Sequence, residues 1–212
     1  PFVQMVSRRH GHRPALRVVD LGTGPGWVPI RLAQAHPDWE FWAVDISADM
    51  LDLGRRHARE AGVAGRVHFV RADATCLPFE SGLFDLALSH FFLHHLERPE
   101  DLFQEAARVL RPGGAAMIKD LHRQPAWRAR LLLWFSKYIL RYSKEQLLTY
   151  RESLHAALNA EEVRRALANS PLHDGKLRSL RGLDLIVEAA KPVGVLQPTR
   201  PGERLGMRYV TS

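Results

Sequence analysis

The sequence contains a single cysteine, Cys76, among its 212 residues. One cysteine cannot build an intramolecular disulfide framework or a cysteine metal cluster, and it suits a protein of the reducing cytoplasm. The chain also lacks any run approaching the roughly 20 apolar residues that cross a bilayer, and it does not open on a secretory signal. We therefore expect a cytoplasmic protein that carries no metal site.

The sequence likewise has no block of one charge. Its 30 Lys and Arg residues outnumber 23 Asp and Glu residues, for a formal net charge of +7, but the arginines are scattered over predicted helices. No recognised nucleic-acid-binding motif accompanies this charge, so the composition disfavours nucleic acid as a partner. The 46% of hydrophobic residues is ordinary for a folded protein, and the length predicts one domain.

Short runs rich in β-forming residues alternate with helical patterns through the first half of the chain. Strands separated by single helices are typical of a parallel, doubly wound sheet. The expected strands are 16–21, 40–46, 66–72, 83–89 and 115–121, and the expected helices are 28–36, 48–61 and 99–110.

The spacing changes after the fifth expected strand. A long helical region from 125 to about 170 precedes two further β-like runs, 176–181 and 183–190, which only Gly182 separates. Two strands joined by so short a turn predict a tight antiparallel hairpin. The segment 191–212 is rich in Pro, Gly and Arg, which is typical of a flexible tail.

These patterns predict an α/β fold with a doubly wound seven-stranded sheet that is mostly parallel and ends in an antiparallel C-terminal hairpin strand. We expect one domain over residues 1–190, with a helical insertion at about 125–170, followed by the tail at 191–212. The sequence contains no recognisable internal repeat or second domain.

The stretch VVDLGTGPGWVPI, residues 18–30, places three glycines at every second position after the first expected strand. Gly22, Gly24 and Gly26 allow a tight turn and a close approach of ligand to main chain, at the loop where open parallel sheets bind ligands. A dinucleotide fingerprint, G-x-G-x-x-G, would place its last glycine at Trp27. The spacing therefore opposes a nicotinamide-dependent oxidoreductase, which is the less favoured alternative.

Three acids stand at the ends of the first three expected strands: Asp20, Asp45 and Asp73. Asp45 lies about 20 residues beyond the glycine loop, where a carboxylate accepts from both hydroxyls of an unphosphorylated ribose. Asp73 could accept from an adenine amino group. Each acid alone is typical of a helix cap or a solvated loop. Together, around one glycine loop, they favour a nucleoside-binding site.

Residues 16–190 resemble the class I S-adenosylmethionine-dependent methyltransferases, in their small-molecule branch. Residues 20–26, DLGTGPG, resemble the family's first motif, and residues 109–114, VLRPGG, resemble its turn into strand five. Residues 84–89 match its fourth strand. The resemblance implies a Rossmann-like fold whose last, antiparallel strand is inserted between strands five and six.

The resemblance also implies how the site is used. The glycine loop would cradle the methionine part of S-adenosylmethionine, Asp45 would bind the ribose, and Ile46 would form an apolar wall under the adenine. Methyl transfer would leave S-adenosylhomocysteine as the product. The cofactor-binding residues implied are Asp20, Gly22, Thr23, Gly24, Gly26, Asp45, Ile46, Asp73, Ala74 and Ser89.

Two histidines after the fourth expected strand are the candidate catalytic residues. His90 and His94 are four positions apart and would share one face if this segment is helical. They could act as a general base or orient the acceptor, and a base is needed only when the acceptor arrives protonated. Two alternatives stay open: the pair caps or packs, or it binds a metal, for which no third ligand is recognisable.

Residues 126–141 carry aromatic side chains at helical spacing, with basic residues around them. Three interpretations stay open: the segment packs on the sheet, forms a lid over the acceptor pocket, or makes a peripheral contact with a membrane surface. The second and third predict a small-molecule acceptor that is apolar or aromatic, or anionic. A resemblance to quinone-type C-methyltransferases is consistent with this at the level of fold.

Two further questions stay open at the level of sequence. Instead of an enzyme, the chain could be a non-catalytic S-adenosylmethionine-binding or scaffolding module that has kept the pocket. A homodimer is compatible with the sequence, which carries no further information on assembly.

Overall fold

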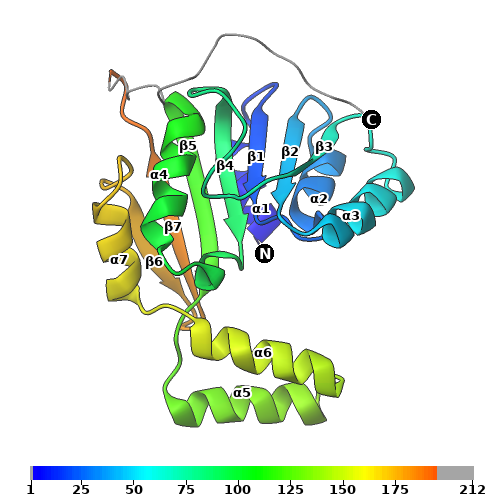
Figure 1. The fold of residues 1–212 in the computed structure, drawn as a ribbon, viewed down its shortest axis with the longest axis vertical. Helices are drawn as coiled ribbons and strands as arrows, with labels where there is room; N and C mark the ends of the chain where they lie inside the picture. The colour runs from blue at the N-terminus through cyan, green and yellow to red at the C-terminus, as the bar shows by residue number, and fades with distance from the viewer. Residues whose placement is uncertain (1, 195–212) are drawn as a thin grey trace.

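A mixed sheet of seven strands runs through residues 2–194, the part of the chain that the computed structural model describes (Figure 1). Its strands are β1 (Arg17–Leu21), β2 (Glu40–Asp45), β3 (Val67–Arg71), β4 (Phe84–His90), β5 (Leu110–Leu121), β6 (Lys176–Leu180) and β7 (Asp184–Ala190). The strand order is β3-β2-β1-β4-β5-β7-β6. Neighbours among β1 to β5 are parallel, whereas β7 is antiparallel to both β5 and β6. The predicted sheet, with its last strand inserted beside strand five, is confirmed.

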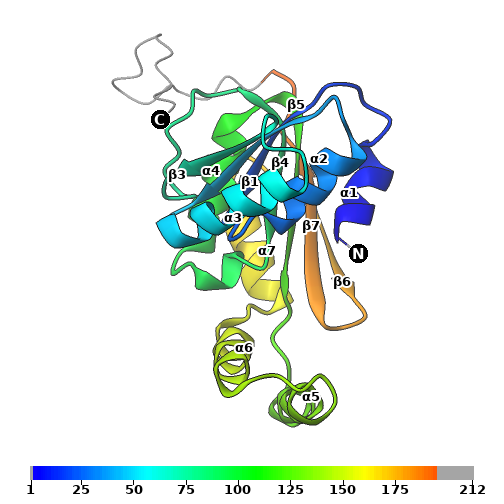
Figure 2. The ribbon, with the colours of Figure 1, turned by 90° about the vertical axis from the view of Figure 1, so that its right-hand side faces the viewer.

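Helices cover both faces of this sheet. They are α1 (Phe2–His10), α2 (Trp27–Ala35), α3 (Ala48–Glu60), α4 (Pro99–Val109), α5 (Ala126–Tyr138), α6 (Lys144–Ala156), α7 (Ala160–Ala168) and a short 3-10 helix, η1 (Leu93–His95). Helices α1, α2 and α3 lie on one face, and α4 and α7 lie on the other (Figure 2). These three layers are those of the predicted doubly wound α/β fold.

Alternation along the central strands divides apolar side chains between two cores. In β1, Val18 packs with α1, α2 and α3, whereas Val19 and Leu21 pack with α4 and α7. In β4, every residue from Phe84 to Ser89 is buried, because helices cover this strand on both sides. The packed sheet holds the carboxyl ends of β1, β2 and β4 in place at one edge of the molecule.

The C-terminal strands form the predicted antiparallel hairpin. β6 ends at Leu180, β7 begins at Asp184, and the N–H of Leu183 donates to the carbonyl of Leu180 at 3.0 Å. Arg181 and Gly182 have positive φ angles of 51° and 67°, which the turns of tight hairpins require.

The helical region expected at about 125–170 consists of three helices with two different roles. α5 and α6 form a helical hairpin that stands beyond the carboxyl ends of the parallel strands (Figure 1). α7 instead packs against the sheet, with Val163 and Leu167 in the core. The insertion over this edge is therefore shorter than expected, because the apolar face of α7 belongs to the main core.

Two adjacent chain segments connect the α5–α6 hairpin to the sheet. His122 and Leu158 form a parallel bridge, and the N–H of Arg123 donates to the carbonyl of Leu158 at 2.9 Å. We call these segments, residues 122–125 and 157–159, the neck. The hairpin has further contacts outside the neck: α6 contacts η1, and Arg128 of α5 donates to the carbonyls of Arg181 and Gly182.

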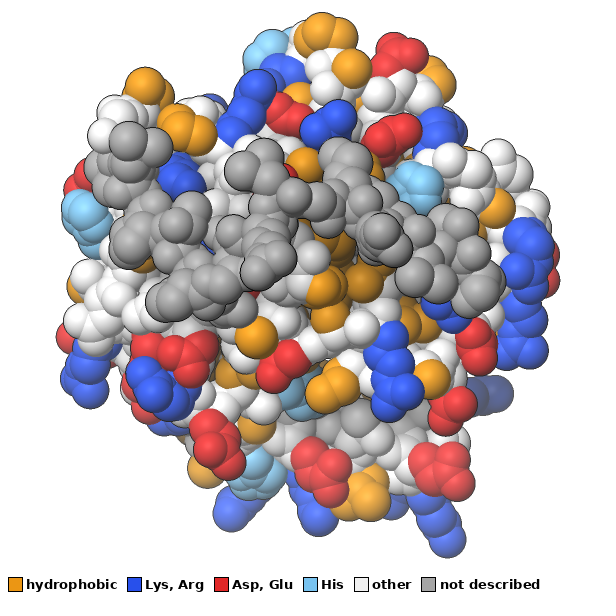
Figure 3. Space-filling view, turned by 45° about the horizontal axis from the view of Figure 1, so that its top comes forward, with side chains coloured by type: hydrophobic (Ala, Val, Ile, Leu, Met, Phe, Trp, Pro, Cys, Tyr) orange, Lys and Arg blue, Asp and Glu red, His pale blue; other side chains and the backbone are white. Residues whose placement is uncertain are grey.

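The surface carries charges of both signs. On the face drawn in Figure 3, Lys and Arg side chains alternate with Asp and Glu instead of forming one basic patch. None of the described helices combines the length and the apolar character that crossing a bilayer requires.

Only the first four residues of the tail expected at 191–212 belong to the described part of the chain. Among them, Lys191 is buried and its ammonium group donates to the carbonyl of Leu110 at 2.7 Å. The start of this segment is therefore attached to β5. The remainder of that prediction lies outside the described residues.

Candidate active site

The glycine loop lies between β1 and α2, at the carboxyl edge of the sheet. Gly22, Gly24 and Gly26 have φ angles of 69°, 54° and 75°, in the left-handed region that glycine adopts without strain. A methyl group on Gly22 would overlap the ring of Phe92, and one on Gly26 would lie 2.9 Å from the ring of Phe69. A methyl group on Gly24 would meet nothing within 4 Å. Two glycines are thus required for packing, and the third faces open space that a ligand can fill.

Asp45, the last residue of β2, organises this loop. Its Oδ2 accepts from the N–H of Gly24 at 2.8 Å, and its Oδ1 accepts from the N–H of Ser47 at 2.9 Å. Each carboxylate oxygen keeps a further lone pair, so Asp45 can hold the loop and still accept from a ligand. The next residue, Ile46, has 66% of its surface exposed and offers an apolar surface beside these oxygens.

Asp20 lies beneath the loop and is 2% exposed. Its Oδ2 accepts from the hydroxyl of Thr23 at 2.6 Å, whereas its Oδ1 is buried without a partner among the described residues. Burial raises the pKa of Asp20 to about 7; the bond from Thr23 opposes this shift, and the charge of Asp45 adds to it. A buried carboxyl with one bare oxygen fits a ligand that brings an N–H donor or a positive charge.

Asp73 lies two residues beyond β3 and is exposed. Its Oδ1 accepts from the N–H and the hydroxyl of Thr75, at 2.8 and 2.7 Å. Ala74 is buried in the core, so only its main chain can meet a ligand. Because β3, β2 and β1 are neighbours, the three acids of the sequence pattern lie along one edge of the sheet.

Ser89 also has a structural role. This residue is fully buried, and its hydroxyl donates to the carbonyl of Leu21 at 2.9 Å. The side chain therefore ties β4 to β1 beneath the glycine loop. The hydroxyl hydrogen is used inside the protein, and a contact of Ser89 with the cofactor stays a prediction.

The two candidate catalytic histidines do not share a helical face. His90 ends β4, Phe91 has a positive φ of 59°, and His94 belongs to the 3-10 helix η1. His90 turns toward α1 and stacks on Phe2 with ring centroids 5.0 Å apart. Burial, followed by the charge of Lys119, lowers the pKa of His90 to about 4. The condition for a common face is therefore not met, because residues 90–92 are not helical, and a catalytic role of His90 stays a prediction.

His94 instead forms a buried pair with Asp120. Its Nδ1 lies 2.7 Å from Oδ1 of Asp120, and the two side chains are 2% and 3% exposed. Asp120 also accepts from the main-chain N–H groups of His94 and Leu121, at 3.3 and 2.6 Å. Because a carboxylate can only accept, Nδ1 donates to Asp120, and Nε2 is the ring nitrogen left for another partner. This Nε2 is buried and has no partner among the described residues.

Asp120 is a candidate functional residue that the sequence analysis missed. It closes the strand expected at 115–121, and β5 lies next to β4 in the sheet. The sequence does contain one indication of this role. Asp120 is an acid at the end of an expected strand, and His94 follows the strand next to it. The structure also shows no group of three or more possible metal ligands within residues 2–194.

A cavity of about 390 Å³ lies between η1 and the α5–α6 hairpin. Phe91, Leu132 and Leu154 are among its apolar lining residues, and His94 also lines it. None of its described lining residues is Lys or Arg. A pocket of this size and character suits a small, largely apolar molecule.

Gln124 adds a second hydrogen-bond acceptor to the cavity lining. Its Nε2 donates to the carbonyls of His122 and Gly182, which sets the orientation of the amide. Its Oε1 is buried without a partner among the described residues. Tyr150 also lines the cavity, and burial raises the pKa of its hydroxyl, which keeps it protonated. The cavity therefore suits a ligand that brings hydrogen-bond donors of its own.

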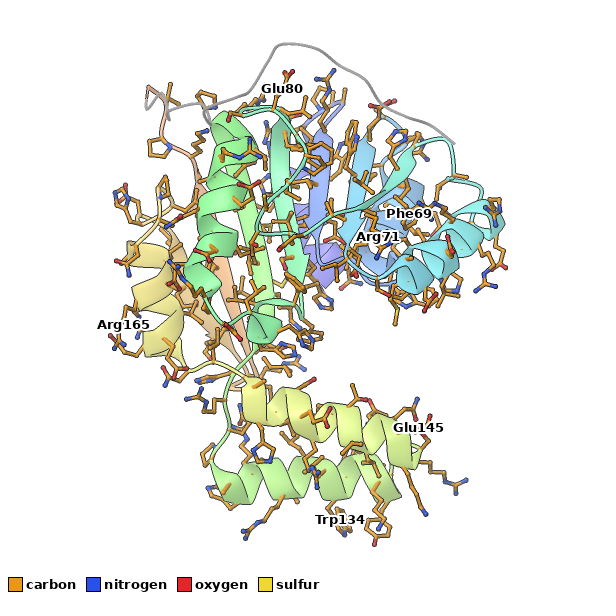
Figure 4. All side chains as sticks on the ribbon, in the orientation of Figure 1. Phe69, Arg71, Glu80, Trp134, Glu145 and Arg165 are labelled. Carbon is orange, nitrogen blue, oxygen red and sulfur yellow. The ribbon has the colours of Figure 1, made fainter. Side chains whose placement is uncertain are left out.

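One of the three interpretations of residues 126–141 is wrong. α5 packs on α6 and not on the sheet, and Trp127 and Trp134 are 67% and 53% exposed. Figure 4 shows the side chain of Trp134 pointing away from α6 and from the sheet. The reason is that the α5–α6 hairpin extends beyond the sheet edge, where no strand can cover it. The lid and the membrane contact stay predictions.

Comparison with known proteins agrees with the motifs. Residues 18–114 match the family model described as a methyltransferase domain. The ubiquinone/menaquinone biosynthesis C-methyltransferase UbiE of Ectopseudomonas mendocina is 37% identical over 114 residues, which cover 53% of this chain and 44% of the relative. The chain spans less than half the length of the curated relatives it matches.

Solved structures share the fold over most of the chain. A SAM-dependent methyltransferase from Aquifex aeolicus has a TM-score of 0.66 at 16% identity, covering 89% of each chain. Geranyl diphosphate C-methyltransferase from Streptomyces coelicolor has a TM-score of 0.67 at 17% identity, covering 90% of this chain and 75% of that one. Residues 18–114 therefore match a methyltransferase domain, and the fold around them is that of the class I S-adenosylmethionine-dependent methyltransferases, whose cofactor is S-adenosylmethionine.

Proposed function

We propose that this chain transfers a methyl group from S-adenosylmethionine to a small apolar or aromatic acceptor that carries an ionisable hydroxyl group. When bound, S-adenosylmethionine supplies an electrophilic sulfonium methyl group. One observation carries the proposal: His94 lines the cavity, its Nε2 has no partner among the described residues, and its Nδ1 is held by Asp120. The names of the curated relatives, C-methyltransferases of quinone biosynthesis, support an aromatic acceptor.

The cofactor would lie across the carboxyl ends of β1, β2 and β3. Its methionine part would cover the open face of Gly24, with its ammonium group toward the bare Oδ1 of Asp20. Asp45 would accept from the ribose hydroxyls, and Ile46 would lie under the adenine. Asp73 and the main chain of the residue after it would meet the adenine edge. Asp20, Gly24 and Ile46 would thus contact three different parts of the cofactor.

The acceptor would lie in the cavity, with its hydroxyl on His94. Nε2 of His94 takes the hydroxyl proton, and the Asp120 carboxylate stabilises the imidazolium that results. The acceptor oxygen, or a ring carbon made electron-rich by it, would form a bond to the methyl carbon as the methyl–sulfur bond breaks and S-adenosylhomocysteine leaves. A ring carbon methylated in this way would then lose its proton to water. In-line placement of the reacting atoms supplies the rest of the rate enhancement.

The lining of the cavity favours a neutral acceptor over an anionic one. An anionic acceptor needs a cation beside it, because a charge buried without a partner is costly. The described lining residues include Asp184 but no Lys or Arg. Lys119 precedes Asp120 in the chain, but its ammonium group forms an ion pair with Asp184, with 2.9 Å between Nζ and Oδ2. We therefore favour the apolar or aromatic acceptor of the two classes that the sequence suggests.

The experiment compares matched acceptors. Purified protein is incubated with S-adenosylmethionine and either a phenol or hydroquinone with an apolar tail, or the methyl ether of the same compound. Formation of S-adenosylhomocysteine is measured by mass spectrometry. We expect turnover with the hydroxyl compounds and none with the ethers, because only the former present a proton to His94.

Other outcomes separate the alternatives. Equal turnover of hydroxyl compounds and ethers would remove the base from the mechanism. Tight binding of S-adenosylhomocysteine in calorimetry, without turnover of any acceptor, would favour a non-catalytic binding or scaffolding module. Binding of NAD in preference to S-adenosylhomocysteine would favour an oxidoreductase and contradict the cofactor assignment.

A further inference from the structure

α5 carries large apolar side chains on the surface that the proposed methyl transfer does not use. Trp127, Leu131, Trp134 and Tyr138 are 67%, 55%, 53% and 56% exposed. At about 100° per residue, the four fall within a sector of about 60° around the helix axis. We call these four residues the aromatic stripe. Figure 4 shows Trp134 on the side of α5 that points away from α6.

The aromatic stripe is not needed to hold α5 in place. The opposite side of the helix does this, since Leu132 lines the cavity and Ser136 is buried. Ile139 and Leu140, which are 56% and 51% exposed, continue the apolar surface beyond the end of the helix. A contiguous exposed apolar surface of this kind marks an interaction site more often than a random surface position.

Positive charge surrounds the aromatic stripe without a balancing acid. Residues 121–144 contain no Asp or Glu. Arg130 and Lys137 flank the stripe on one side of the helix, and Arg141 follows the helix end. Within residues 2–194, these three cations take part in no ion pair. The surface is therefore apolar along its middle and cationic along its margin.

We propose that α5 docks this protein on the surface of a membrane that contains anionic lipids. The aromatic stripe would enter the interfacial region, and Arg130, Lys137 and Arg141 would contact lipid phosphates. Trp and Tyr suit this region because the ring is apolar while its N–H or O–H stays hydrated. Long basic side chains reach outward while their stems cover apolar surface. This inference does not depend on the proposed methyl transfer.

Charge decides between a membrane and a second copy of the chain. In a two-fold dimer formed through this face, the aromatic stripe of one copy would pack against the aromatic stripe of the other. Arg130, Lys137 and Arg141 would then face the same cations of the other copy, with no acid within residues 121–144 to balance them. An anionic bilayer supplies the opposite charge. Charge complementarity therefore favours the membrane over a homodimer.

The test is flotation of the purified chain with vesicles of phosphatidylcholine alone or mixed with phosphatidylglycerol. We expect binding to the anionic vesicles that weakens with added salt, because exposed charges are screened. Trp127→Ser combined with Trp134→Ser should weaken binding by about tenfold or more, since both rings leave the interface. Arg130→Gln combined with Lys137→Gln should weaken it by about tenfold as well.

Arg56→Gln combined with Arg59→Gln is the matched control, because it removes the same charge from exposed positions of α3. This control should bind like the wild type, and all variants should keep the wild-type unfolding midpoint. Absence of binding to anionic vesicles overturns the proposal, as does binding that the stripe variants leave unchanged. A dimer in sedimentation equilibrium that the Trp127 and Trp134 variants dissociate would assign the stripe to a second copy and also overturn it.

Discussion

Nδ1 of His94 lies 2.7 Å from Oδ1 of Asp120, although the two residues are 26 positions apart in the chain. The neighbouring parallel strands β4 and β5 bring them together, in a register that also pairs His90 with Lys119. The carboxylate holds Nδ1 of His94, which lines the cavity, and Nε2 has no partner among the described residues. In the proposed methyl transfer, Asp120 would compensate the positive charge that His94 gains with the acceptor's proton.

His94→Gln should remove this proton acceptor and keep the volume of the side chain. We expect kcat for a phenolic acceptor to fall by about 10²-fold to 10⁴-fold, the usual range for a general base. Affinity for S-adenosylhomocysteine, measured by calorimetry, should stay close to that of the wild type, because His94 faces the cavity and not the glycine loop. His173→Gln, in an exposed His–Asp pair, is the control and should leave kcat unchanged.

Asp120→Asn tests whether the carboxylate acts through His94. The variant should lose about 10²-fold in kcat with a protonated phenol. An acidic phenol that is already ionised at the assay pH does not need the base, so the wild type and the variant should methylate it at similar rates. A loss of rate that is equal for both acceptors would show that Asp120 has only a structural role.

Gly24→Ala should separate ligand binding from folding. The added methyl group meets no protein atom within 4 Å, but it occupies the space assigned to the cofactor. We expect affinity for S-adenosylhomocysteine to fall by about tenfold or more, which corresponds to at least about 1.4 kcal/mol. Gly62→Ala is the matched control, because its φ of 69° is also positive and its surroundings are also open. Both variants should lose about 1–2 kcal/mol of stability from the strained backbone, and only the first should lose affinity.

Asp45→Ala should weaken cofactor binding by about 1.5–3 kcal/mol, the scale of a hydrogen bond to a charged group. The loss has two sources: the ribose contact, and the bonds that Asp45 accepts from the N–H groups of Gly24 and Ser47. Calorimetry with S-adenosylhomocysteine measures it. Asp49→Ala changes an exposed acid in the first turn of α3 and should bind normally. Unchanged affinity in Asp45→Ala would remove this residue from the site.

His90→Phe should make the protein less sensitive to acid. The pKa of His90 is lowered from 6.5 to about 4 in the folded state, mainly by burial. Below pH 6.5 the unfolded chain binds the proton first, so stability is lost as pH falls toward 4. Phe can keep the stacking on Phe2 without this penalty.

At about pH 5 the acid-induced loss should be about 1–2 kcal/mol smaller in His90→Phe than in the wild type. Urea unfolding at pH 7 and pH 5 measures this difference. His10, whose pKa burial also lowers to about 4, keeps its own share of the acid sensitivity in both proteins. Equal losses in the two proteins would show that His90 is accessible to protons in the folded state.

The parts of the fold that depend on local backbone chemistry were predictable from sequence. The glycine loop is one example, since Gly22, Gly24 and Gly26 all have the positive φ angles that their spacing suggests. The turn at Gly182 is another. In both cases the residue type itself restricts the conformation, so no knowledge of distant parts of the chain is required.

The candidate base shows where such reasoning stops. A spacing of four residues predicts that His90 and His94 share one face if the segment is helical. The chain instead turns at Phe91, which has a positive φ directly after the end of β4. Asp120 could not be paired with His94 from the sequence alone, because their contact depends on the order of strands in the sheet. Tertiary neighbours of this kind leave no periodic signal.

The segment 126–141 was ambiguous for a different reason. Helical spacing of aromatic residues predicts an apolar face, but it carries no information on whether that face points inward or outward. In α5 the aromatic face is the outer one, and a narrower side that includes Leu132 and Ser136 points inward. Only the position of α6 between α5 and the sheet edge decides the matter.

The neck joins the α5–α6 hairpin to the sheet through two short chain segments, which the bridge between His122 and Leu158 holds side by side. Leu132 of α5 and Leu154 of α6 line the cavity, as do His94 and Leu121 at the sheet edge. The shape of the cavity therefore depends on how the hairpin is seated against the sheet, whereas the glycine loop belongs to the sheet alone.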